Sequence, residues 1–252
     1  MIKIIMYGCN GHMGQVISGL IKDDPEAEIV AGIDVVDDRD NGYPVFTDIQ
    51  ACDVDADVVI DFSSPQALQG LLDYCVKKQI PAVLCATGLN EEQLAKIEDA
   101  SKRVAILKSA NMSLGVNMLL RIIQDAAKVL AHAGFDMEVV EKHHRLKKDA
   151  PSGTALALAD SLNEAMGSAY RYVYDRSQRK EARGDKEIGL SAVRGGSIVG
   201  EHDVIFAGPD EVVTFSHASY SKAVFGKGAV EAAKFLAGKP AGYYQMSDVI
   251  SK

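Results

Sequence analysis

The chain has 252 residues, 47% of them hydrophobic, and a formal net charge of −8. This length and apolar content suffice for one large hydrophobic core or two smaller ones, and the ordinary glycine and proline content speaks against disorder or a fibrous structure. The acidic balance argues against general nucleic-acid binding, which requires a basic face to neutralise phosphates, but it does not exclude a local anion site.

The first part of the chain predicts alternating strands and helices. A short apolar run, Ile2–Tyr7, precedes a glycine-rich turn, and Met13–Lys22 carries apolar residues at helical spacing. Short connections separate the later elements, which favours a parallel sheet of the doubly wound type. The further predicted strands are Glu28–Ile33, Asp57–Asp61, Ala82–Cys85 and Val104–Leu107, and the further predicted helices are Pro65–Gln79 and Glu91–Lys102.

The pattern changes after about Ser113. A long helical pattern at Val116–Ala133 leads to a predicted strand at Asp136–Lys142, and the later strands are separated by glycine and charged residues. This arrangement is typical of an α+β domain with a mixed, largely antiparallel sheet. The remaining predictions are helices at Ala155–Met166 and Gly228–Leu236 and strands at Ile188–Val193, Ile198–Phe206 and Glu211–Ala218.

The cysteines and the N-terminus bear on the compartment. Cys9, Cys52, Cys75 and Cys85 form no CxxC pair, which argues against a disulfide framework or a structural zinc site and favours a reducing environment. The first residues, MIKIIMYGCNG, lack a long apolar segment with a cleavage site, and no apolar run reaches the ~18 residues of a membrane span. We expect a soluble cytoplasmic protein with no membrane contact.

Three glycines, Gly8, Gly11 and Gly14, lie between the first predicted strand and the first predicted helix. Glycines are needed where the backbone turns sharply and approaches a pyrophosphate, which the N–H groups of a helix N-terminus then bind. The spacing is GxxGxxG and differs from the common GxGxxG, but the strand before and the helix after it favour dinucleotide binding. The alternative is an ordinary tight turn.

Asp34 ends the second predicted strand, 20 residues after Gly14. A carboxylate at this place accepts hydrogen bonds from the adenosine ribose hydroxyls and repels a 2′-phosphate. Val35, Val36, Asp37 and Asp38 follow, and a site that prefers NADP usually adds an arginine nearby. The sequence therefore predicts a preference for NADH, with a solvated loop acid as the alternative.

Two further segments follow strands of the same predicted sheet. Cys85–Gly88 comes after Ala82–Leu84, and Ser109–Ser113 comes after Val104–Leu107. Open parallel sheets bind ligands beyond the carboxyl ends of their strands. We expect small polar residues of these segments to face the nicotinamide and its ribose.

The stretch EKHHRLKKDAPSGTA, Glu141–Ala155, concentrates positive charge in an acidic chain. His143 and His144 are adjacent, so on a strand they point to opposite sides, and no cluster of cysteines or carboxylates completes a metal site with them. Lys147 follows within five residues. We predict no metal, and we expect this segment to supply charge and a proton donor.

A helix start follows the basic residues. Ser152 and Thr154 are good N-cap residues, and Gly153 lets the backbone come close to a ligand. A helix N-terminus with free N–H groups is suited to a carboxylate. The segment therefore predicts a site for a small, multiply negative substrate, and the alternative is a solvated basic loop before a capped helix.

With these motifs in place, the whole chain resembles the dihydrodipicolinate reductase family, also called 4-hydroxy-tetrahydrodipicolinate reductase, of lysine and diaminopimelate biosynthesis. Glu141–Ala155 resembles the family signature E-x-H-H-x-x-K-x-D-A-P-S-G-T-A, and Gly8–Gly14 resembles its G-x-x-G-x-M-G turn. Cys85–Gly88 resembles its G-T-T-G and Ser109–Gly115 its A-P-N-F-S-x-G, with Cys85 and Ala86 in place of Gly and Thr. Lys222 stands where the family usually has Arg.

The resemblance implies the fold, the partners and the roles. It implies a Rossmann-type dinucleotide-binding domain formed by residues 1–113 and 222–252, and an α+β substrate and oligomerisation domain formed by residues 114–221 of a homotetramer. His143 and Lys147 match the proton donors. The implied ligands of the substrate carboxylates are His144, Gly153 and Thr154. The implied contacts to NADH or NADPH are Gly8, Cys9, Asn10, Gly11, His12, Met13, Asp34, Cys85, Ala86, Thr87, Ser109, Ala110, Asn111 and Met112.

Two other hypotheses stay open from the sequence. One is a related dehydrogenase of another small amino or keto dicarboxylate, such as an aspartate dehydrogenase, which has no need of the HHxxK and SGT residues. The other is a non-catalytic NAD sensor, which keeps Gly8–Gly14 and Asp34 but needs no proton donor beside an anion pocket.

Overall fold

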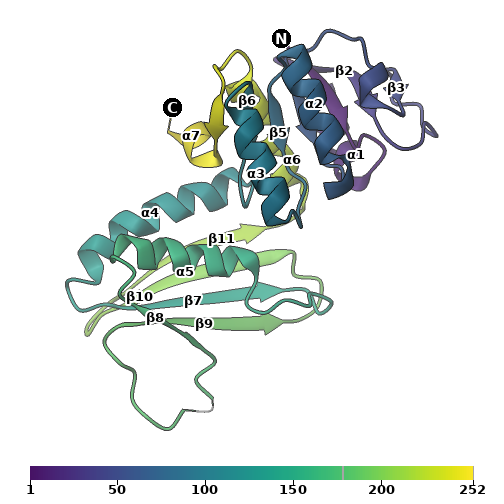
Figure 1. Cartoon of the computed structure of the whole chain (residues 1–252). Helices are drawn as coiled ribbons and strands as arrows, with labels where there is room; N and C mark the ends of the chain where they lie inside the picture. The colour runs from purple at the N-terminus through teal and green to yellow at the C-terminus, as the bar shows by residue number, and fades with distance from the viewer. Residues whose placement is uncertain (178, 252) are drawn as a thin grey trace. The chain divides into compact units, whose positions relative to one another are not determined.

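The computed structural model describes residues 1–177 and 179–251. The chain forms two compact units, each with its own sheet (Figure 1). Unit 1 comprises Met1–Leu114 and the C-terminal residues from Ala223 onward, and unit 2 is Gly115–Lys222. No helix in the described part of the chain has the length and apolar content needed to cross a membrane.

The sheet of unit 1 is parallel and doubly wound. Its strand order is β12-β6-β5-β4-β1-β2-β3, and β1 pairs with both β2 and β4. The strand order reverses beside β1, and a ligand crevice is expected at the carboxyl end of the sheet at such a reversal. The strands are β1 (Ile2–Tyr7), β2 (Ala27–Ile33), β3 (Val45–Phe46), β4 (Val58–Asp61), β5 (Ala82–Leu84), β6 (Ala105–Lys108) and β12 (Gly242–Tyr244).

Helices cover both faces of this sheet. On one face, α1 (His12–Lys22), α6 (Ala223–Leu236) and α7 (Met246–Ile250) pack on side chains such as Ile4 and Met6. On the other, α2 (Leu68–Lys78) and α3 (Glu91–Ser101) pack on side chains such as Ile5 and Val59. Strand residues of alternating direction thus supply two separate cores. Two 3-10 turns, η1 (Ile49–Ala51) and η2 (Pro65–Ala67), complete the connections.

The sheet of unit 2 is mixed, in the order β11-β10-β7-β9-β8. The pairs β10/β11 and β10/β7 are antiparallel, whereas β7/β9 and β8/β9 are parallel, so the antiparallel share is smaller than the sequence predicts. The helices α4 (Leu114–Leu130) and α5 (Gly153–Ala165) lie on one face of the sheet (Figure 1). The strands are β7 (Asp136–His143), β8 (Arg171–Tyr174), β9 (Glu187–Arg194), β10 (Gly200–Ala207) and β11 (Val212–Ser219).

Strand β7 positions the candidate site of unit 2. Its residues alternate between half-buried and buried, and Met137 and Val139 belong to the core beneath α4 and α5. The same alternation makes Glu141 and His143 buried. The strand therefore carries two polar side chains into the helix-covered face at its carboxyl end.

Candidate active site

The glycine-rich turn of unit 1 has no room for a side chain at Gly8 or at Gly14. Gly8 has a φ of +81°, and a Cβ there would lie 2.8 Å from the carbonyl oxygen of Phe62. A Cβ at Gly14 would lie 2.2 Å from the carbonyl oxygen of Gly8. Gly11, the N-cap of α1, brings no side-chain cap, and the first turn of α1 has no acidic residue. The turn therefore has the shape and electrostatics that suit a pyrophosphate.

Asp34 lies against this turn. Its Oδ2 accepts a 2.8 Å hydrogen bond from the backbone N–H of Asn10, and its Oδ1 accepts one of 2.8 Å from Val35. The Asn10 side chain donates to the carbonyl oxygen of Val36 at 2.7 Å. The structure thus brings the predicted phosphate turn and the predicted ribose ligand together.

Arg39 follows the acidic run after Asp34, and sequence reasoning overlooked it. Its side chain is 54% exposed, and its Nε lies 4.0 Å from a carboxylate oxygen of Asp38. The sequence could have indicated it, because Arg39 directly follows the residues Val35–Asp38 that were considered for NADP selectivity. An arginine in this loop is a candidate ligand for a 2′-phosphate.

The two later cofactor segments lie at the carboxyl ends of β5 and β6. Cys85, Ala86 and Met112 are buried, so their side chains are not exposed at this edge. Thr87 and Ala110 are exposed, whereas Ser109 and Asn111 are half-buried. Burial raises the pKa of the Cys85 thiol, which keeps it protonated and argues against a nucleophilic role.

Lys108, the last residue of β6, is a further candidate that sequence reasoning missed. Its Nζ donates a 2.9 Å hydrogen bond to the carbonyl oxygen of Ala86 and so ties the Cys85–Gly88 segment to β6. Burial lowers the pKa of Lys108, while the nearby Cys85 and Asp61 act in the opposite direction. The sequence feature that could have identified it is a lysine at the end of an otherwise apolar strand.

In unit 2, Glu141 and His143 meet at the end of β7. The Nδ1 of His143 lies 2.6 Å from Oε2 of Glu141. Arg194, at the end of β9, donates from Nη1 and Nη2 to the two carboxylate oxygens at 2.7 and 2.6 Å. Burial acts to raise the pKa of Glu141, but the hydrogen bonds from Arg194, His143 and the Ser152 backbone outweigh it and lower that pKa. Glu141 is therefore an ionised buried carboxylate.

The start of α5 joins the same cluster. The N–H of Ser152 donates to Oε1 of Glu141 at 3.0 Å, and the Ser152 hydroxyl accepts from the N–H of Ala155 as the N-cap of α5. Gly153 and Thr154 form the first turn of the helix. A Cβ added at Gly153 would have nothing within 4 Å, so the space in front of this turn is open within the chain.

The predicted proton donor Lys147 lies in the turn between β7 and α5. Its N–H donates to the carbonyl oxygen of His144 at 3.1 Å, and its Nζ lies 2.9 Å from Asp149. The Lys147 side chain is 22% exposed, and His144 is half-buried beyond the end of β7. The basic stretch thus folds into a turn that connects His143 with Ser152.

His202, on β10, is a buried residue that sequence reasoning did not single out. Its ring lies 5.2 Å from that of His143 in a T-shaped arrangement, and its Nε2 is 3.1 Å from the Ser152 hydroxyl. Burial, with the charge of His143 as the next cause, lowers the pKa of His202 to about 4. The ring is therefore neutral at neutral pH. Its Nδ1 and the Nδ1 of His217 are buried without a partner among the described residues.

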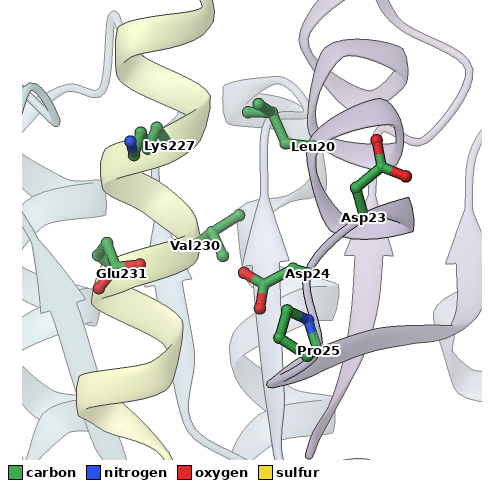
Figure 2. A pocket seen from close by; sticks show the side chains of 7 residues that line it. All are labelled: Leu20, Asp23, Asp24, Pro25, Lys227, Val230 and Glu231. Carbon is green, nitrogen blue, oxygen red and sulfur yellow. The ribbon is translucent and has the colours of Figure 1, made fainter.

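The described residues contain no group of three or more His, Cys, Asp or Glu side chains placed to hold a metal ion. A separate pocket of about 360 Å³ lies between the last turn of α1 and α6 (Figure 2). Because α1 leads from the carboxyl end of β1 to the start of the parallel strand β2, its last turn lies near the amino ends of the strands, away from the predicted cofactor residues. The pocket is lined by Leu20, Asp23, Asp24, Pro25, Lys227, Val230 and Glu231.

Comparison with known proteins covers almost the whole chain. Residues 2–112 match the family model described as dihydrodipicolinate reductase, N-terminus, and residues 115–250 match the model of its C-terminus. The chain is 52% identical over 252 residues to a 4-hydroxy-tetrahydrodipicolinate reductase of Caldanaerobacter subterraneus subsp. tengcongensis, covering 100% of this chain and 99% of that protein. It is 45% identical over 251 residues to the protein of that name from Clostridium tetani, covering 100% and 98%.

Solved structures share the fold. A dipicolinate-bound dihydrodipicolinate reductase from Paenisporosarcina sp. TG-14 superposes with a TM-score of 0.82 at 23% identity, covering 97% of each chain. An aspartate dehydrogenase from Thermotoga maritima gives a TM-score of 0.52 at 12% identity, covering 95% of this chain and 98% of that one. At such identities the likeness concerns the fold alone.

Proposed function

The chain belongs to the dihydrodipicolinate reductase family, and on that premise we propose that it reduces 4-hydroxy-tetrahydrodipicolinate to tetrahydrodipicolinate with NAD(P)H in lysine and diaminopimelate biosynthesis. The observation that carries this proposal is the 52% identity to a relative of that name over the full chain. The two predicted sites support it, because a dinucleotide turn and a basic anion site are what a reductase of a small dicarboxylate needs.

Unit 1 is the proposed dinucleotide-binding domain. The Gly8–Gly14 turn would hold the pyrophosphate, and the Cys85–Thr87 and Ser109–Met112 segments would border the nicotinamide. When bound, the dinucleotide supplies a hydride. The absence of space for side chains at Gly8 and Gly14 supports this assignment, since a cradle of bare backbone is what a pyrophosphate requires.

We propose a preference for NADH over NADPH. The Asp34 carboxylate accepts one hydrogen bond at each oxygen and has further lone pairs for ribose hydroxyls. A 2′-phosphate at this place would be repelled by the same charge. The exposed Arg39 in the same loop offers a partner to that phosphate, so NADPH remains a usable second cofactor.

Unit 2 is the proposed substrate domain. The N-terminal turn of α5 at Gly153 and Thr154, with His144 nearby in sequence, would bind a substrate carboxylate. His143 and Lys147 would supply the proton that accompanies hydride addition, a contribution of about 10²–10⁴-fold for a general acid. A positive Lys147 would also stabilise the negative charge that develops on the ring as hydride arrives.

A variant pair tests this assignment. Lys147→Ala should lower kcat by at least about 10²-fold and leave the dissociation constant of NADH unchanged. Lys148→Ala, an exposed neighbour with the same charge, serves as the control and should keep near-normal turnover. Equal losses of turnover and NADH affinity in Lys147→Ala would remove Lys147 from its proposed role.

The homotetramer is a further proposal, and the sheet of unit 2 supports it. Val193 and Val212 lie on the sheet face opposite α4 and α5 and are 47% and 62% exposed. Apolar strand residues on such a face are suited to packing against another copy. Sedimentation analysis of the wild type beside Val212→Lys tests it, since a charge in the interface should dissociate the oligomer.

A further inference from the structure

The buried carboxylate of Glu141 is the hub of the unit 2 site. It accepts four hydrogen bonds: from His143, from the Ser152 backbone, and from the two terminal nitrogens of Arg194. These donors come from the end of β7, from the start of α5 and from the end of β9. The fully buried Glu141 thus joins the predicted proton donor His143 to the predicted carboxylate-binding turn at the start of α5.

The direction of these bonds fixes the state of His143. An ionised carboxylate can only accept hydrogen bonds, so the Nδ1 of His143 carries the hydrogen. In the neutral ring, Nε2 then keeps its lone pair and is the nitrogen that takes up or releases a proton. A Cβ at Gly200 would lie 3.0 Å from Nε2, so the glycine leaves the space beside this nitrogen free of a side chain.

Arg194 extends the cluster to the Lys147 turn. Besides its fork to Glu141, its Nη2 donates a 2.6 Å hydrogen bond to the carbonyl oxygen of Asp149, whose side chain pairs with Lys147. A paired guanidinium favours the ionised form of Glu141 and holds its plane in one orientation. The ion pair therefore sets the places of His143, of the Lys147 turn and of the start of α5 together.

We propose that Glu141 is a positioning residue for the reduction: it holds His143 in the Nδ1–H tautomer, with Nε2 as the proton-exchanging nitrogen, and keeps the Gly153 turn at a fixed place beside it. This inference rests on the proposed role of His143. Glu141 itself touches neither substrate nor cofactor in this account.

The alternative is that Glu141 has a purely structural role. Breaking a buried ion pair by removing one partner is strongly destabilising, so a loss of stability alone would not distinguish the two roles. The tautomer of His143 and the split between kcat and KM do distinguish them. The first test therefore needs no variant at Glu141.

Nitrogen NMR of histidine-labelled wild-type protein at high pH reports the tautomer directly. His143→Gln identifies the His143 signals by their loss. We expect the Nδ1–H form of His143 to dominate. A dominant Nε2–H form would overturn the inference, whatever the activity of the enzyme.

Glu141→Gln provides the second test. Its amide nitrogen faces either His143 and Nη1 of Arg194 or the Ser152 N–H and Nη2 of Arg194, so two of the four contacts are lost in each orientation. We expect kcat to fall by about 10²-fold or more, with the dissociation constant of NADH unchanged and partial recovery in Glu141→Asp. Glu201→Gln is the matched control, because Glu201 lies on the neighbouring strand β10 and pairs with Lys142 instead.

The outcomes separate the inference from the function on which it rests. A kcat of Glu141→Gln within twofold of wild type, beside a large loss in His143→Gln, would overturn the positioning role and leave the reductase intact. A wild-type protein that binds NADH and reduces nothing would overturn the proposed function. In that case the wild-type tautomer still decides whether Glu141 fixes the His143 ring.

Discussion

The backbone N–H of Asn10 donates a 2.8 Å hydrogen bond to the carboxylate of Asp34, which lies 24 residues further along the chain. This contact joins the glycine-rich turn to the end of β2. A dinucleotide bound with its pyrophosphate at the turn would have its adenosine ribose near Asp34. Under the proposed assignment, this pair would connect cofactor binding with cofactor selectivity.

Asp34→Ala should lower the ratio of kcat/KM for NADH to that for NADPH by about tenfold, the worth of one hydrogen bond to a charged group. Arg39→Ala should act in the opposite direction and weaken NADPH more than NADH. Steady-state kinetics with both cofactors measure the two ratios. An unchanged ratio in Asp34→Ala would show that Asp34 does not set the preference.

Gly14→Ala should abolish tight NADH binding, because its Cβ would lie 2.2 Å from the carbonyl oxygen of Gly8 and the turn would have to move. We expect the dissociation constant to rise by at least about tenfold, measured by titration of NADH fluorescence. Gly19→Ala is the control in the same helix, since a Cβ there meets nothing within 4 Å. It should bind NADH normally and raise the free energy of unfolding by about 0.5–1 kcal/mol. Normal NADH binding by Gly14→Ala would place the pyrophosphate elsewhere.

Gly153→Val should raise the KM of the substrate by about tenfold or more and change the KM of NADH little. A Cβ at Gly153 meets nothing within 4 Å, so we expect the fold to tolerate the substitution and the loss to reflect blocked access to the N–H groups of α5. Thermal unfolding of the variant checks the first point, and substrate titration checks the second. A wild-type KM would exclude Gly153 from the substrate site.

The free energy of unfolding should decrease as the pH drops from about 6.5 to about 4, and His202 should cause part of this decrease. Burial lowers the pKa of His202 from 6.5 to about 4, so the unfolded chain binds a proton in this window that the folded chain does not. The free energy of unfolding therefore decreases with falling pH, by up to about 3 kcal/mol from this group.

His202→Gln tests the origin of that slope. Glutamine does not titrate and can still form a hydrogen bond with the Ser152 hydroxyl, so the free energy of unfolding should decrease less between the two pH values. His132→Gln, which changes an exposed histidine, should keep the wild-type slope. Equal slopes in wild type and His202→Gln would show that His202 is not the buried neutral ring described above.

The elements of the fold that depend on local sequence patterns could be predicted from the sequence. The β1 strand, the glycine-rich turn and α1 follow from apolar spacing and glycines within Ile2–Lys22, and the parallel sheet follows from the alternation of such elements. Strands β8 and β12 were missed because Arg171–Tyr174 and Gly242–Tyr244 are not uninterrupted aliphatic runs, unlike the similarly short β5 (Ala82–Leu84). Their place is set by pairing with β9 and β6, which only the tertiary structure reveals.

The residue types of the candidate site could be predicted from the sequence, but the contacts between them could not. The basic stretch and the helix start of α5 indicated an anion site, and the family resemblance named His143 and Lys147. The pairing of Glu141 with Arg194, 53 residues apart, depends on the register of β7 and β9 and has no local signature. The burial of His202 beside Ser152 likewise results from the β7/β10 pairing.

The most direct test of the central claim is hydride transfer itself. Purified synthase makes the unstable substrate in situ from pyruvate and aspartate semialdehyde, and NADH dideuterated at C4 of the nicotinamide is then added with this protein. We predict rapid oxidation of NADH and the appearance of tetrahydrodipicolinate that carries one deuterium, by mass spectrometry. The reductase assignment is wrong if the protein binds NADH but oxidises neither NADH nor NADPH and transfers no deuterium to the product.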